Sequence, residues 1–401
     1  MMAARLNPAD HAWMTSPATL RVMAALEKAA PGGARFVGGC VRNALMGEPV
    51  ADIDIATVLE PDVARTALEA AGIAVHATGI EHGTLTAVAD HRPFEVTTLR
   101  RDVSTDGRRA TVAFTTDWAE DAARRDFRLN ALYADMTGEI FDLVGGLDDI
   151  PARRIVFIGK AEDRIAEDYL RILRFFRFYA RYGQGEPDAE ALRACAAMTG
   201  GLSQLSAERV WMETKKLLAA PDPGPALRLM AETGVSDALF GTAGDAGRVS
   251  RLAGLGGDDP LVRFSAWLGK AAADRARALR LSKAEALRVR KMADPDLAQA
   301  VADEWSTRAA LEKRVYRFGN QAVADQLWLL FSEGDMPPEG WGGAMAHALS
   351  FEAPVFPVTG ADLKRSGFAA SPEMGETLRR LENDWIGSRF CLSKPELLER
   401  I

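Results

Sequence analysis

Hydrophobic and polar positions follow two different periods in the first hundred residues of the chain. Residues 15–30 place apolar side chains at helical spacing behind Ser16 and Pro17, which predicts a capped amphipathic helix. A short apolar strand follows at Phe36 and Val37, residues 62–71 favour a helix again, and 84–88 and 94–99 alternate as strands do. This mixture predicts a small α/β head with a mostly antiparallel sheet.

From residue 151 onward the pattern is helical almost throughout. Apolar residues from Ile165 to Tyr179 recur at helical spacing and predict one long helix that begins near Glu162. The stretch 221–225 contains three prolines and a glycine, which predicts a domain boundary. Further helices are expected at 226–233, 259–273, 282–292, 306–317 and 320–332, the third opened by a capping box of Ser282 and Glu285. We therefore expect an α+β protein with domains at 1–150, 151–220 and 221–401.

Two glycines stand where the Phe36 strand ends. Gly38 and Gly39 precede a helix-compatible run, so the backbone N–H groups at the start of that helix can face an anion. Arg42 adds a fixed positive charge to the same turn. The pattern predicts a phosphate cradle, although a glycine pair taken alone is most often just a turn.

Ten residues later the chain has two aspartates separated by one isoleucine. On a strand, Asp52 and Asp54 would point the same way while Ile53 and Ile55 enter the core. Two adjacent carboxylates repel each other unless a cation lies between them, and Mg²⁺ prefers carboxylate, water and phosphate oxygens. We expect Asp52 and Asp54 to bind Mg²⁺; a solvated strand face is the simpler alternative. Glu95 lies on a later strand and is a candidate third carboxylate, or an exposed edge residue.

Charged residues are dense in four later stretches. Residues 100–109 are polar and predict a mobile loop, and the run Arg124 to Leu132 is expected to open a helix. In the long predicted helix, an acid and three arginines follow one another at intervals of three: Asp168, Arg171, Arg174 and Arg177. Ion pairs on a solvated face would account for the first two, but not for so many arginines among aromatic residues. A basic cluster at 275–291 suits an RNA backbone or a solvated helix face equally well.

Composition narrows the class of protein. A chain of 401 residues with 48% hydrophobic content is long enough for several domains. Three cysteines far apart in sequence argue against a disulfide framework or a thiolate zinc site. No signal peptide and no membrane-spanning run is evident, so a cytoplasmic location is expected. A net charge of −7 makes whole-surface RNA binding less expected, without excluding a basic groove.

The glycines, the arginine and the aspartates together form the pattern Gly-Gly-x-Val-Arg-(x9)-Asp-x-Asp. This resembles the active-site motif of the bacterial class II CCA-adding tRNA nucleotidyltransferases and the related bacterial poly(A) polymerases. Asn43 departs from it, because the family usually has aspartate there. The run at 124–132 is similar to the family motif Arg-Arg-Asp-Phe-Thr-x-Asn-Ala-Leu, with Arg128 in place of threonine. The resemblance implies that Arg125 and Asp126 contact the incoming nucleotide.

The stretch from Glu167 to Phe178 resembles the family's Glu-Asp-x-x-Arg-(x2)-Arg-(x2)-Arg-Phe neck motif. The resemblance implies that Asp168 and Arg171 recognise the nucleobase and that Arg174 and Arg177 support it and the phosphates. It also implies an all-α neck, body and tail after the head, with tRNA, CTP and ATP as partners and Mg²⁺ as cofactor. The expected reaction adds CMP, CMP and AMP to the tRNA 3′ end.

Three alternatives stay open at this point. A poly(A) polymerase shares the same core, but residues 79–86 look like the CCA-adding version. An enzyme that adds only CC or only A is harder to exclude from one sequence. A non-catalytic RNA-binding descendant would be expected to have lost a metal carboxylate, and both aspartates are present.

Overall fold

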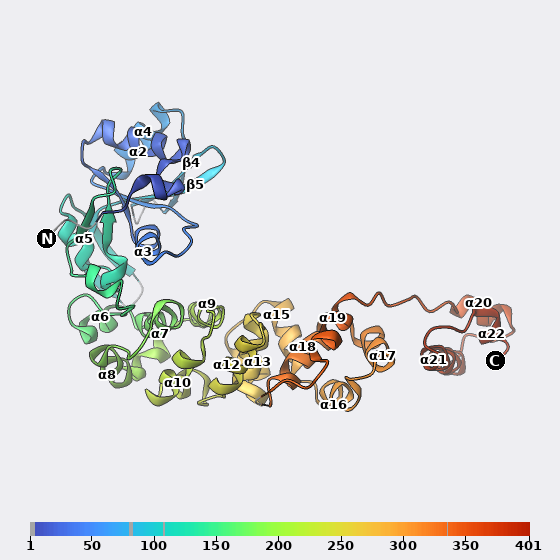
Figure 1. Cartoon of the computed structure of the whole chain (residues 1–401). Helices are drawn as coiled ribbons and strands as arrows, with labels where there is room; N and C mark the ends of the chain where they lie inside the picture. The colour runs from blue at the N-terminus through green and yellow to red at the C-terminus, as the bar shows by residue number, and fades with distance from the viewer. Residues whose placement is uncertain (1–4, 80–82, 107–108, 335) are drawn as a thin grey trace. The chain divides into compact units, whose positions relative to one another are not determined.

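The computed structural model of the chain describes residues 5–79, 83–106, 109–334 and 336–401 (Figure 1). Two compact units are found in it: residues 1–217 with 226–243, and residues 218–225 with 244–401. The first contains all of the β-structure, and the second is helical. The expected α+β class, a small mixed sheet followed by helices, is confirmed.

The head is built on a seven-stranded sheet with the order β3-β4-β5-β2-β1-β8-β9. Its pairs are antiparallel except for β2 and β5, which run parallel. Helices α2 and α4 pack against each other and against β4 (Figure 1), while α3 contacts β1 and β8. The strands are β1 (Ala34–Val37), β2 (Asp54–Thr57), β3 (Ala74–Gly79), β4 (Thr84–Ala89), β5 (Arg92–Thr98), β8 (Leu132–Ala134) and β9 (Ile140–Asp142).

Helix α2 of the first unit begins where the sequence predicts it. The expected N-cap at Ser16 is confirmed, since its side chain accepts a hydrogen bond from Thr19 N. The helices of this unit are α1 (Ala12–Thr15), α2 (Pro17–Ala29), α3 (Gly39–Met46), α4 (Pro61–Ala70), α5 (Trp118–Ala123), α6 (Ala161–Glu167), α7 (Leu170–Tyr182), α8 (Ala189–Ala197), α9 (Ala207–Leu218), α10 (Gly224–Glu232) and α11 (Val235–Phe240).

Four sequence expectations are wrong in this unit. Asp52 precedes β2 instead of lying on it. The stretch expected as a loop forms an antiparallel hairpin of β6 (Arg100–Asp106) and β7 (Arg109–Phe114). The run at 124–132 follows a helix and forms only a short 3₁₀ turn, Arg128–Asn130, before β8. The long helix expected from Glu162 is broken, because Asp168 adopts an extended conformation (φ −158°, ψ 107°) between α6 and α7.

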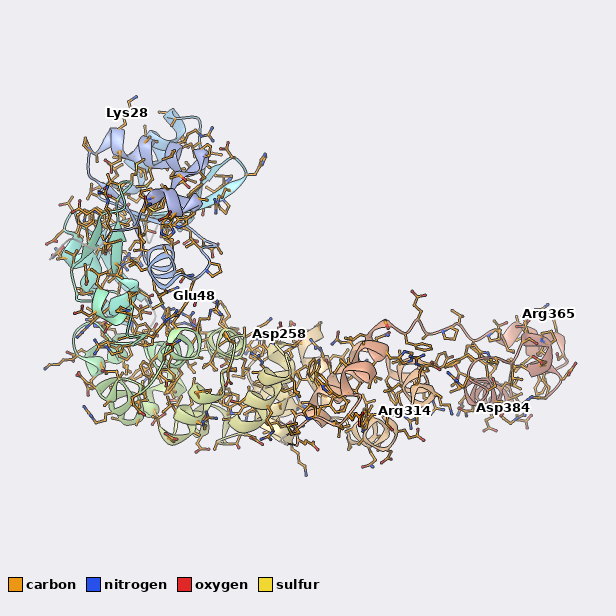
Figure 2. The ribbon with its side chains drawn as sticks, in the orientation of Figure 1. Lys28, Glu48, Asp258, Arg314, Arg365 and Asp384 are labelled. Atoms are coloured by element: carbon orange, nitrogen blue, oxygen red, sulfur yellow. The ribbon has the colours of Figure 1, made fainter. Side chains whose placement is uncertain are left out.

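Head and neck (residues 151–220) are joined by charged contacts as well as by packing. Glu48, labelled among the side chains in Figure 2, lies 3.2 Å from Arg153 of the neck. The phenol of Tyr182, the last residue of α7, accepts a hydrogen bond from Arg42 on α3 (2.7 Å). The head therefore contacts the neck through polar side chains of α3 and of the residues that follow it.

The second unit is helical, and its described residues include the two apolar clusters given next. One involves α16 to α19, and the other surrounds Leu381 and Trp385 near the C-terminus. The predicted capping box of Ser282 and Glu285 is confirmed. The helices are α12 (Ala246–Gly254), α13 (Pro260–Leu268), α14 (Ala272–Ala278), α15 (Lys283–Met292), α16 (Pro295–Glu304), α17 (Arg308–Phe318), α18 (Asn320–Phe331), α19 (Trp341–Ser350), α20 (Gly360–Arg365), α21 (Pro372–Gly387) and α22 (Lys394–Leu398).

Arg288, which belongs to the predicted basic cluster at 275–291, forms ion pairs within the second unit. Arg288 donates two hydrogen bonds of 2.8 Å to the buried carboxylate of Asp325 and also lies 2.7 Å from Asp259. Such a bidentate pair leaves little of the guanidinium free for a phosphate. Arg288 therefore holds α15 to α18. In the described part of the chain, no helix is both long enough and apolar enough to span a membrane.

Candidate active site

The two glycines place the first turn of α3 against an open pocket. Gly38 has φ +69° and ψ −119°, a conformation that side-chain-bearing residues rarely adopt. A Cβ on Gly38 would lie 3.5 Å from the carbonyl oxygen of Asn130, an ordinary contact, so the backbone conformation and not a lack of space favours glycine. Glycine therefore allows β1 to turn sharply into α3, whose first N–H groups are free to face an anion.

Arg42 is buried under this turn and is held by three side chains. It donates to Asn130 Oδ1 (2.5 Å), to Tyr182 (2.7 Å) and, through Nε and Nη2, to Asn43 Oδ1 (3.1 and 2.8 Å). Burial lowers the pKa of Arg42 from its ordinary value. Asn43 thus orients the arginine as a carboxylate would, but without the gain of a charged acceptor.

The carboxylates expected to bind metal are brought together only in part. Asp54 of β2 lies opposite Glu95 of β5, and this is the first residue pair of the two parallel strands. Burial first, and then the charges of Glu95 and Asp52, raise the pKa of Asp54 to about 6. A divalent cation would remove that repulsion, so the donor set of Asp54 and Asp52 fits a hard ion such as Mg²⁺.

Among the described residues no group of three or more histidine, cysteine or acidic side chains is placed to hold a metal. Phosphate and water oxygens would have to complete the coordination of an ion on Asp52 and Asp54. A role of Glu95 as a third ligand stays a prediction.

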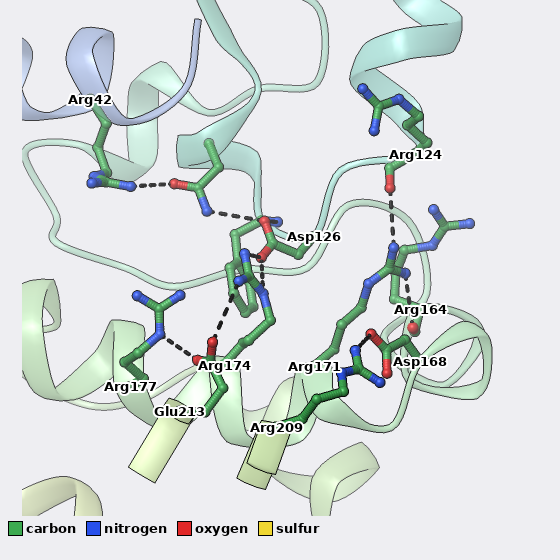
Figure 3. A network of polar contacts seen from close by, with 12 residues as sticks. Arg42, Arg124, Asp126, Arg164, Asp168, Arg171, Arg174, Arg177, Arg209 and Glu213 are labelled. Carbon is green, nitrogen blue, oxygen red and sulfur yellow. Dashed lines mark hydrogen bonds and ion pairs between the residues drawn. The ribbon is translucent and has the colours of Figure 1, made fainter. Parts of the chain in front are cut away.

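Asp126 lines the pocket and also contacts Arg174 of the neck. Its carboxylate accepts hydrogen bonds from Asn130, from the Phe127 N–H and from Arg174 of α7, where Arg174 Nε lies at 2.8 Å (Figure 3). Burial acts against ionisation, but Arg174 and these donors outweigh it and lower the pKa of Asp126. The carboxylate therefore stays charged and fixes Arg174.

The other neck arginines are held in different ways. Arg177 donates to Glu213 of α9 at 2.6 Å. The guanidinium groups of Arg42, Arg174 and Arg177 all lie within 6 Å of the ring centre of Phe178. Facing an aromatic ring partly offsets the cost of gathering like charges.

Asp168 and Arg171 lie near each other without pairing. Asp168 accepts a hydrogen bond from Leu170 N and one of 2.6 Å from Arg209 of α9 (Figure 3). Arg171 pairs with Glu167 and donates to the carbonyls of Arg164 and Arg124. The expected arrangement, two residues one turn apart on a single helix, is wrong because Asp168 lies in the break before α7.

A pocket of about 460 Å³ collects most of the predicted residues. It brings together Gly38, Gly39, Arg42, Asp54, Arg125, Asp126, Asp168, Arg171 and Arg174. Asp52, Glu95 and Arg177 are not among its lining residues. The sequence alone suggested no role for five residues that also line it: Arg124, Asn130, Leu170, Phe178 and Arg209. The first four lie inside motifs already quoted, whereas nothing near Arg209 in sequence signals its approach to Asp168.

Asp121 organises the arginines on the head side of the pocket. Its side chain is 1% exposed and accepts hydrogen bonds from Arg124, Arg125 and the phenol of Tyr133. Burial alone would raise the pKa of Asp121, but the charges of Arg125 and Arg124 and the Tyr133 hydrogen bond outweigh it and lower the pKa to about 2. Asp121 therefore stays ionised and holds Arg125 in place.

We expect Asp121→Asn to destabilise the fold by on the order of 2 kcal/mol at pH 7, because an amide cannot balance two buried guanidinium groups. The depressed pKa means that the native stabilisation is complete above about pH 4 and is lost as the pH falls toward 2. Chemical denaturation at several pH values measures this, with Asp117→Asn as an exposed control. A difference between Asp121→Asn and the native chain that does not shrink between pH 4 and 2 would contradict the assignment.

Two family models match the chain. The poly A polymerase head domain matches residues 34–156, and the model described as a probable RNA and SrmB-binding site of polymerase A matches residues 186–242. The chain is 34% identical over 384 residues to the mitochondrial CCA tRNA nucleotidyltransferase 1 of Danio rerio, a match covering 92% of this chain and 86% of the relative. It is 40% identical over 238 residues to a CCA-adding enzyme of Streptococcus pneumoniae, covering 58% of each.

The fold is also similar to a solved structure. The CCA-adding enzyme of Bacillus stearothermophilus in complex with CTP superposes with a TM-score of 0.78 at 26% identity, over 96% of this chain and 98% of that one. The head-domain match covers the glycine turn and the aspartates, and the identity extends through the neck. The chain belongs to the CCA tRNA nucleotidyltransferase family.

Proposed function

We propose that this chain adds CMP, CMP and AMP to the 3′ end of tRNA, using CTP and ATP and releasing pyrophosphate. The observation that supports this most is one pocket lined by the first turn of α3, by the carboxylate of Asp54, and by Asp168 and Arg171. In the reaction the ribose 3′-oxygen forms a bond to the α-phosphorus while the bond to the bridging β-phosphate oxygen breaks. No protein nucleophile is needed.

Each group of residues has a separate task in this proposal. The N–H groups at Gly39 and the guanidinium groups of Arg42 and Arg125 bind and orient the triphosphate. Asp52 and Asp54 would hold Mg²⁺, which when bound activates the 3′-hydroxyl and neutralises charge on the phosphates. Arg174 and Arg177 support the nucleotide from the neck.

The base is selected by hydrogen-bonding pattern in the absence of a template. Cytosine and adenine each present an amino donor beside a ring-nitrogen acceptor, and uracil and guanine present the reverse. An aspartate only accepts and an arginine only donates, so Asp168 and Arg171 fit the first two bases. Arg209 occupies Asp168 Oδ2 in this structure, so the incoming amino group has to share or replace that contact.

The domain roles follow from these assignments. We propose that the head (1–150) performs catalysis, that the neck (151–220) recognises the base, and that the body and tail (221–401) bind tRNA. A cytoplasmic site of action is part of the same proposal, although the Danio rerio relative is named as mitochondrial.

Incorporation of radiolabelled CTP and ATP into tRNA lacking its CCA end tests the function. We expect the native chain to add both nucleotides, and Asp54→Asn to lose at least about a hundredfold in rate while keeping its fold and tRNA affinity. Asp62→Asn, an exposed aspartate on α4, is the matched control. Addition of long adenylate tails from ATP alone would indicate a poly(A) polymerase instead. Near-native turnover by Asp54→Asn would contradict the metal assignment.

The base-edge assignment is tested by changing both partners. We expect Asp168→Asn with Arg171→Gln to weaken the use of CTP and ATP and to raise relative UTP or GTP incorporation by about tenfold or more, because each buried mismatch is worth on the order of 1–3 kcal/mol. Arg181→Ala, a more exposed arginine of the same helix, is the control. Competition assays with all four nucleotides measure the preference. An unchanged preference for C and A would mean that other residues select the base.

A further inference from the structure

The helical second unit contains a cavity that none of the proposed functions uses. It has a volume of about 530 Å³, within the range of small-molecule sites, and is lined by residues of α13, α15, α16 and α18. Its walls are largely aliphatic, formed by Val289, Met292, Pro295, Ala298 and Leu329. An apolar cavity of this size with a few polar groups is suited to a compact, partly apolar ligand.

Ser265 gives the cavity its first polar group. This residue of α13 is 6% exposed and lines the cavity, and its hydroxyl has no hydrogen-bond partner among the described residues. A serine inside a helix usually satisfies its hydroxyl on the carbonyl four residues earlier. In the described part of the chain that bond is not made, so a buried hydroxyl beside the cavity lacks a hydrogen-bond partner.

Gln326 on α18 supplies the second polar group. Its Nε2 donates to the carbonyls of Lys291 (3.1 Å) and Met292 (3.0 Å), and the residue is 4% exposed. These two carbonyls fix the orientation of the amide, because an oxygen in place of the nitrogen would face two acceptors. The Oε1 atom is then left as an acceptor, and Gln326 lines the cavity.

Charge argues against a strongly anionic ligand. Lys270 and Arg248 line the cavity, but so do Asp294 and Glu333. The Arg248 guanidinium is engaged by the Leu329 carbonyl, by Ser332 and by Glu333. The ligand should therefore be neutral in the part that enters, with one hydrogen-bond donor for Gln326 and one polar group for Ser265.

We propose that this cavity binds a nucleobase. A base is planar and largely apolar on its faces, is uncharged, and presents donors and acceptors side by side on one edge. Two sources supply it: a free nucleoside, or an unpaired residue of the bound RNA turned out of its stack. The RNA source rests on the proposed function, and the free nucleoside does not.

Photocrosslinking with 4-thiouridine tests this in the full chain, in the absence of CTP and ATP. The probes are the free nucleoside and a tRNA without its CCA end that contains 4-thiouridine at unpaired positions. We expect crosslinks on peptides containing Met292 or Leu329. Ala298→Leu, which fills the cavity, should reduce them by about tenfold, and Ser265→Ala by roughly threefold or more. Ala284→Leu, an exposed position on α15, should change them less than about twofold.

The outcomes separate the two sources and the two proposals. Crosslinks from the free probe identify a nucleoside site, and crosslinks from the RNA alone identify a turned-out residue. Absence of crosslinks on these peptides from both probes, or full crosslinking by Ala298→Leu and Ser265→Ala, would overturn the inference. Because Ser265→Ala removes a single atom, it keeps the test valid if the larger variant unfolds. A native chain that crosslinks the nucleoside but adds no CMP would refute the proposed function and leave the nucleobase site standing.

Discussion

The ion pair between Asp126 and Arg174 is the interaction on which the candidate site depends. Asp126 follows α5 in the head, and Arg174 lies in the first half of the neck helix α7. Asp126 is buried and Arg174 is partly exposed, and Asp126 also accepts a hydrogen bond from Asn130, which in turn accepts one from Arg42. A single carboxylate thus connects the side of the pocket that is proposed to bind the phosphates to the side that is proposed to recognise the base.

Ion pairs with buried acids, like that of Asp126 and Arg174, also explain how an acidic protein maintains a pocket rich in arginine. Four arginines in or beside the pocket pair with buried acids: Asp121 holds Arg124 and Arg125, Asp126 holds Arg174, and Glu213 holds Arg177. Each carboxylate accepts hydrogen bonds from some N–H groups of a guanidinium and leaves the other N–H groups for other partners. Removing one acid therefore exposes uncompensated charge, which costs more than the pair itself contributes.

Much of this arrangement could be predicted from local sequence, and the failures have physical reasons. The strand at Phe36, the glycine turn after it and the capping box at Ser282 depend on neighbouring residues, and the predictions for them hold. Helical periodicity continues across Asp168 because one extended residue hardly changes the spacing of apolar positions, so the break is hidden. The approach of Arg209 to Asp168 spans 41 residues and depends on how α9 packs, which no local pattern reports.

A double-mutant cycle on Asp126 and Arg174 tests the dependence of the site on their ion pair most directly. The measured quantity is kcat/KM for CTP incorporation by Asp126→Asn, Arg174→Gln and the double variant, with thermal unfolding as a control for folding. If the two residues act as one unit, kcat/KM of the double variant should be no lower than that of the less active single variant. The coupling energy should then be on the order of 2 kcal/mol. Losses that multiply would contradict this, because each side chain would then act on the nucleotide independently.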